Sequence, residues 1–130
     1  MTTAALCAGV LGLLVFGLGI GVSLMRGATD TVVGYNPDPA DRLYKMVRAH
    51  GNATEYAPML AILILHLGMH EPGPWLRTVF VAAVASRLLH AAGMIMSPSL
   101  ARPQPLRFVG ALGTYLTGIV LGVAAILEAG

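Results

Sequence analysis

Long apolar runs constrain this chain more than any other feature. Residues Ala4 to Met25 carry no charged side chain, and further runs follow Pro58, Trp75 and Leu106. A helix of about 20 apolar residues crosses a bilayer core. Within a helix the backbone N–H and C=O groups hydrogen-bond to one another, and they need to, because lipid offers them no partner. The runs therefore predict a bundle of membrane-spanning helices.

The composition agrees with this interpretation. Hydrophobic residues make up 56% of the 130 residues and charged residues only 11%, whereas a soluble domain carries roughly 25% charged residues. Four spans leave no room for a soluble domain, so one domain over residues 1–130 is expected. The net charge of +2 is too small to indicate a nucleic-acid partner. A single cysteine, Cys7, excludes an intrachain disulfide and a cysteine-based metal site.

The predicted fold is all-α, with four helices at about residues 4–25, 40–67, 75–96 and 106–127. Asp38 is expected to cap the second helix, and Pro58 to bend it. A cleaved signal peptide is disfavoured for the first run, because no Lys or Arg precedes it. Small residues predict close helix packing: the pair Gly17 and Gly21, and the ridge Gly110, Thr114, Gly118 and Gly122.

Basic residues are concentrated on one side of this layout. The connector after the first helix and the polar start of the second hold four of them, and Arg102 and Arg107 precede or begin the fourth helix. The opposite side has only Arg77 near the membrane. The positive-inside rule places the basic connectors in the cytoplasm and both termini outside, in the inner membrane if the protein is bacterial.

Polar residues at the start of the second apolar run are unusual for a lipid-bound helix. Arg48, Asn52 and Glu55 lie at i, i+4 and i+7 and so share one helix face. Ionisable groups in a membrane helix are costly and often functional. Taken singly, each is as plausibly structural: Glu55 could neutralise an arginine, and Asn52 could join two helices.

The predicted topology brings further polar groups to the same end. Arg87 and His90 lie one turn apart near the end of the third helix, Arg107 begins the fourth and Arg26 ends the first. Cations outnumber Glu55 in this group, so a small, water-soluble zwitterionic peptide would complement it. The remaining histidines, His50, His66 and His70, are interpreted as weaker candidates or plain interfacial residues, and no metal site is predicted.

The segment Arg48-Ala49-His50-x-Asn52-x-x-Glu55-Tyr56-x-Pro58 resembles the signature of the MAPEG superfamily, the membrane-associated proteins in eicosanoid and glutathione metabolism. It is closest to the short bacterial members. The likeness extends over nearly the whole chain, through Arg87-x-x-His90 and Arg107-x-x-Gly110.

This resemblance implies a homotrimer of four-helix subunits that binds glutathione between subunits at the cytoplasmic side. Arg107 would hold the glutathione thiol as thiolate, with Arg102 as a competing candidate. The implied glutathione-binding residues are Arg26, Arg48, Asn52, Glu55, Tyr56, Arg87 and His90. The substrate would be a lipophilic electrophile or hydroperoxide that arrives through the membrane lipid.

Two departures from the family pattern leave other functions open. Met94 and Ala111 stand where many family enzymes carry tyrosine, and neither donates a hydrogen bond from its side chain. The chain is therefore expected to be a glutathione transferase or peroxidase, with a non-catalytic glutathione-binding relative as the alternative. A small proton-coupled exporter is less consistent with the sequence. Such proteins need a carboxylate in the first helix, and the first helix here has no charged residue.

Overall fold

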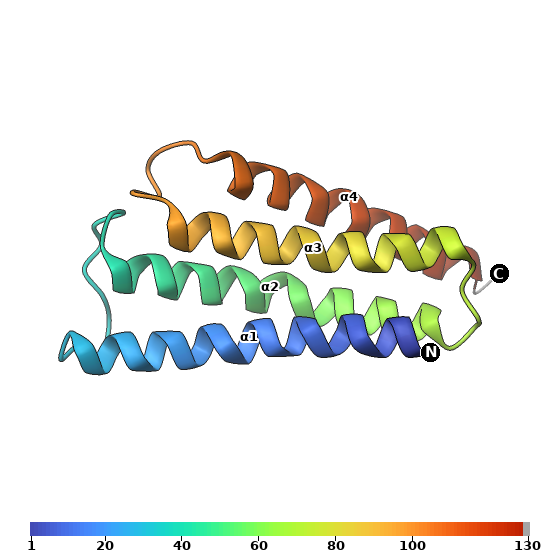
Figure 1. The fold of residues 1–130 in the computed structure, drawn as a ribbon, viewed down its shortest axis with the longest axis horizontal. Helices are drawn as coiled ribbons and strands as arrows, with labels where there is room; N and C mark the ends of the chain where they lie inside the picture. The colour runs from blue at the N-terminus through green and yellow to red at the C-terminus, as the bar shows by residue number, and fades with distance from the viewer. Residues whose placement is uncertain (129–130) are drawn as a thin grey trace.

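The computed structural model describes residues 1–128 as an antiparallel bundle of four helices (Figure 1). The helices are α1 (Thr2–Ala28), α2 (Arg42–Gly68), α3 (Pro74–Met96) and α4 (Pro105–Glu128). The all-α prediction is confirmed, and each predicted helix overlaps its observed counterpart. The α1–α2 and α3–α4 connectors lie at one end of the bundle, called here the connector end. The start of α1 and the end of α4 lie at the other, called the terminal end.

Three of the four helices, α1, α3 and α4, are long and apolar enough to cross a membrane. Their outward side chains are largely apolar: Leu13 and Phe16 on α1 are each 75% exposed, and Ile119 on α4 is 65% exposed. Apolar surface of this extent on a single chain fits contact with lipid rather than water. The second helix does not belong to this set, because its first half carries Arg42, Lys45 and other polar residues.

The start of α2 differs from the prediction. Asp41, not Asp38, is the N-cap, and its side chain accepts a hydrogen bond from the Tyr44 amide at 2.8 Å. Asp38 instead closes the preceding turn, where it accepts from the Ala40 amide. Aspartate is equally suited to both places, so residue type alone could not separate them. Downstream, α2 continues as one helix through Pro58.

Glycines set the spacing between α3 and α4. A Cβ at Gly110 would overlap the backbone of His90, and one at Gly93 would overlap the backbone of Arg107. The predicted ridge on α4 thus packs as expected at Gly110 and Thr114, whereas Gly122 meets open space within the chain. On α1 the prediction was half wrong. Gly21 packs against Met46 of α2, but Gly17 faces open space, and Gly19 contacts α2 instead.

The buried core divides into two parts along the bundle. Large side chains such as Leu11, Ile64 and Phe80 fill the terminal half. The connector half is lined by smaller ones, including Ala49, Ala53 and Ala91. Small residues leave room for longer polar side chains to enter between the helices. The connector half is therefore where a polar site can be accommodated.

Candidate functional site

Arg87 is the centre of the polar cluster inside the bundle. Its side chain is only 1% exposed, and its guanidinium joins three helices. One Nη donates to Asn52 of α2, at 2.7 Å to Oδ1 and 3.2 Å to the backbone oxygen. The other lies 3.4 Å from the hydroxyl oxygen of Thr114 on α4. Arg87 therefore fixes the rotation of α2 and α4 relative to α3.

Two tyrosines complete the surroundings of Arg87. The Arg87 guanidinium carbon lies 5.3 Å from the centre of the Tyr56 ring, within the range of a cation–π interaction. The ring of Tyr56 in turn packs against that of Tyr115, with centroids 5.7 Å apart. Tyr56 was among the predicted site residues. Tyr115 was not, because its spacing from Arg107 gives no signal in the sequence.

No carboxylate of the described chain forms an ion pair with Arg87. Within residues 1–128 the one ion pair joins His70 to Glu128, at the terminal end. The Arg87 Nε is buried without a hydrogen-bond partner. A buried cation without an anion is costly. The cluster of Arg87, Asn52 and Tyr56 thus carries an excess of positive charge.

The predicted helix-two triad is split between interior and surface. Asn52 is half-buried and holds Arg87, whereas Arg48 and Glu55 are both exposed. Neither exposed side chain makes a hydrogen bond or ion pair within the described chain. The structure therefore brings Asn52 and Tyr56 to Arg87 and leaves Arg48 and Glu55 on the outer surface of α2.

His90 and Arg107 form a second group. His90 lies one turn closer to the connector end than Arg87 does. The His90 Nδ1 lies 2.9 Å from the backbone oxygen of Arg107. The Arg107 guanidinium donates to the backbone oxygens of Leu100 and Arg102, both at 3.0 Å. Gln104 caps α4 by accepting from the Arg107 amide at 2.7 Å. An arginine has five N–H donors, so Arg107 has donors left for an anion.

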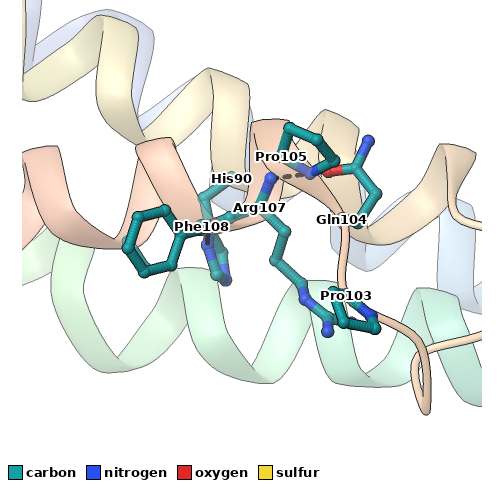
Figure 2. A pocket seen from close by; sticks show the side chains of 7 residues that line it. His90, Pro103, Gln104, Pro105, Arg107 and Phe108 are labelled. Carbon is teal, nitrogen blue, oxygen red and sulfur yellow. Dashed lines mark hydrogen bonds between the residues drawn. The ribbon is translucent and has the colours of Figure 1, made fainter.

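A pocket of about 560 Å³ opens beside Arg107 (Figure 2). Its lining combines polar and apolar side chains. The lining residues are His90, Pro103, Gln104, Pro105, Arg107, Phe108 and Ala111. A cavity of this size can hold a small organic molecule. Gln104 and the pocket itself were missed by the sequence analysis, because both depend on how the α3–α4 connector folds back.

The remaining candidates lie apart from these groups. Arg26 donates from one Nη to three carbonyl oxygens of the α1–α2 connector, the shortest at 2.9 Å to Gly34. Arg102 is exposed, and its contact with Arg107 is made by its backbone oxygen. Met94 is buried, at 7% exposure, and Ala111 lines the pocket. Within the described chain, the Arg26 side chain therefore stabilises the folded α1–α2 connector.

The model of the MAPEG family matches residues 4–127, almost the entire chain. No curated protein matched the sequence. The match covers all four helices and both polar groups described above. The chain therefore belongs to the MAPEG family.

Proposed function

We propose that this protein binds glutathione at the connector end and uses its thiolate to attack a lipophilic electrophile or hydroperoxide. The family includes glutathione-dependent transferases and peroxidases. The observation that carries the proposal is the surplus of guanidinium groups without a carboxylate partner at this end. Glutathione has two carboxylates and one ammonium, so it supplies the missing negative charge.

The exposed residues of α2 complement the two ends of such a peptide. Arg48 offers a guanidinium for a carboxylate, and Glu55, about two turns away, offers a carboxylate for an ammonium. Asn52 is held by Arg87 and so presents its amide in a fixed orientation. In this proposal Tyr56 and His90 line the site, and Arg26 shapes it through the connector.

Arg107 is the proposed group at the sulfur. A free thiol has a pKa of about 8.5, and a neighbouring guanidinium favours the thiolate. In conjugation the thiolate sulfur bonds to the electrophilic carbon while the leaving group departs with its electron pair. In peroxide reduction the sulfur takes the terminal oxygen, the O–O bond breaks, and an alcohol leaves. A second glutathione thiol then converts the sulfenic acid to glutathione disulfide and water.

The pocket beside Arg107 is the proposed place for the lipophilic substrate. Phe108 and the prolines give it an apolar wall, and Phe108 itself is 68% exposed on α4. A substrate dissolved in the bilayer would reach this wall without crossing water. Arg107, which lines this pocket, would then hold the thiolate next to the apolar substrate.

The site is proposed to be completed in a homotrimer, with its opening toward the cytoplasm. Arg48 and Glu55 are exposed and unpaired on the described single chain, which is the arrangement expected of residues at a subunit boundary. A measured protein mass of three chains of 13.5 kDa in detergent would support the trimer. A mass of one chain would contradict it.

Turnover assays test the catalytic role. Arg107→Ala should lower kcat/KM for conjugation of glutathione by about 10²–10³-fold, the loss seen when one donor to a developing anion is removed. The matched control is Arg102→Ala, which removes an exposed arginine of the same connector and should leave kcat/KM within about twofold. Equal activity of wild type and Arg107→Ala would remove Arg107 from the mechanism.

A non-catalytic glutathione-binding protein is the second candidate. Buried Met94 and pocket-lining Ala111 carry no hydroxyl donor at two positions where tyrosine occurs in the family pattern. This alternative predicts saturable glutathione binding without turnover of any electrophile or hydroperoxide. Binding assays and turnover assays on the same preparation therefore separate the two.

A further inference from the structure

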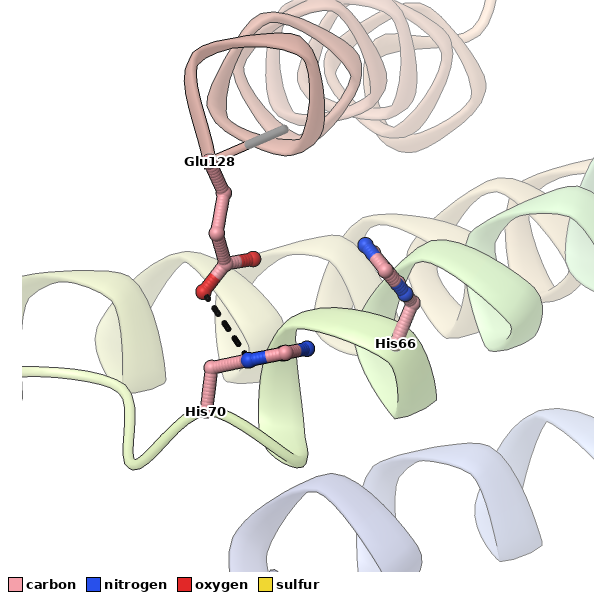
Figure 3. A group of neighbouring side chains, drawn as sticks. All are labelled: His66, His70 and Glu128. Carbon is pink, nitrogen blue, oxygen red and sulfur yellow. Dashed lines mark ion pairs between the residues drawn. The ribbon is translucent and has the colours of Figure 1, made fainter. Parts of the chain in front are cut away.

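Three metal-binding side chains meet at the terminal end of the bundle (Figure 3). His66 lies in the last turn of α2 and His70 one turn later, while Glu128 ends α4. One ligand atom from each lies within 4.8 Å of the others. The two histidines are neighbours in sequence, but the carboxylate comes from the far end of the chain. No metal site was predicted from the sequence, because only the fold brings Glu128 to the two histidines.

The donor set is typical of a zinc site. Two imidazole nitrogens with one carboxylate oxygen suit Zn²⁺ and similar divalent ions. Bonds of 2.0–2.1 Å in a tetrahedron place ligand atoms about 3.3 Å apart, so the three groups need to move slightly closer. The side chains of His70 and Glu128 are 50% and 31% exposed. They therefore have room to change rotamer.

An ion pair alone does not account for the arrangement. The His70 Nδ1 and the Glu128 Oε1 are 3.9 Å apart, and a solvated pair of that length contributes little. An ion pair would also leave His66 without a role. The His66 ring lies edge-on to that of His70, with centroids 5.4 Å apart. A metal ion would use all three groups at once.

The local backbone also favours a cation. His66 and Glu128 lie in the last turns of α2 and α4, and the last turn of a helix carries partial negative charge. Charge and donor chemistry therefore point in the same direction.

We propose that His66, His70 and Glu128 bind one Zn²⁺ ion, which ties the end of α2 to the end of α4. Three protein ligands leave the fourth position of a tetrahedral ion for water. The site lies at the terminal end of the bundle, whereas Arg107 is in the first turn of α4, at the connector end. It is therefore independent of the proposed glutathione site.

The test is a calorimetric titration of Zn²⁺ into the full chain in detergent, purified without a polyhistidine tag. No glutathione is added, because its thiol would compete for the metal. Wild type should bind one Zn²⁺ per chain. His66→Ala, His70→Ala and Glu128→Gln should each weaken binding by about tenfold or more, because each removes one of three ligands. His50→Ala, a histidine at the other end of α2, is the matched control and should bind as wild type does.

A second measurement uses the wild type alone, so that the result does not depend on variants that fail to fold. Co²⁺ added to wild type should give the intense visible absorption of a low-coordinate N/O site, and excess Zn²⁺ should abolish it. Absence of Zn²⁺ binding to wild type would overturn the proposal. So would equal binding by wild type and all three ligand variants, which would locate the metal elsewhere.

Discussion

At the scale of single residues, Arg87 determines how the polar interior is built. Its guanidinium holds Asn52 and Thr114 on two other helices and lies over the ring of Tyr56. The positive charge therefore stays inside the bundle without an ion pair in the described chain. It is oriented by neutral groups, which leaves the carboxylate Glu55 on the surface for other partners.

Asn52→Ala tests this role of Arg87. The substitution removes the 2.7 Å bond and leaves a buried guanidinium with one acceptor fewer, which should cost about 1–3 kcal/mol of stability. Thermal unfolding in detergent, followed by circular dichroism, measures the loss. Thr54→Ala on the exposed side of the same helix is the control and should change stability by less than about 0.5 kcal/mol. Equal stability of both variants would show that the bond is not stabilising.

At the scale of helices, α3 and α4 are held close by glycines. Gly110→Val would force the new side chain into the backbone of His90 and should destabilise the bundle by about 1–3 kcal/mol, as overpacking does. The shift of α4 should also lower glutathione turnover, because Arg107 begins that helix. Gly122→Ala lies on the same ridge but meets open space, so it should not destabilise the bundle and should raise its stability slightly, because alanine is the better helix former. An unaffected Gly110→Val would contradict the close packing.

The helices themselves were predictable, because each apolar run ends at Pro, Gly or charged residues. What could not be predicted is how each helix is rotated. The spacing put Arg48, Asn52 and Glu55 on one face, but only the packed bundle shows that Asn52 alone reaches inward. Thr114 was noticed as a small residue, not as a partner of Arg87, because that contact depends on where α4 lies against α3. The cap at Asp41 was missed because Asp38 suits a cap equally well.

At the scale of the whole molecule, the antiparallel bundle separates two chemical environments. The connector end gathers Arg26, Arg48 and Arg107, and the terminal end holds His66, His70 and Glu128. The distribution of basic residues predicts that the connector end faces the cytoplasm. Glutathione is a cytoplasmic thiol, so the proposed function requires the connector end to face the cytoplasm.

Labelling of single cysteines in intact bacterial cells tests the orientation. In a Cys7→Ser background, Gly73→Cys on the α2–α3 turn should react with a membrane-impermeant maleimide. Ala101→Cys on the α3–α4 connector should react only after the cells are permeabilised. Both positions are exposed, so the difference reports sidedness and not burial. The reverse labelling pattern would place the proposed site outside the cell.

Calorimetric titration of glutathione into the detergent-solubilised protein tests the central proposal most directly. Wild type should show saturable binding, and Arg48→Ala should weaken it by about tenfold, the effect of losing one charge-assisted contact of about 1.4 kcal/mol. Arg77→Ala, an exposed arginine at the terminal end, should bind as wild type does. Saturable binding that requires Arg48 is the predicted result, and absence of glutathione binding to the folded wild-type protein would contradict the account.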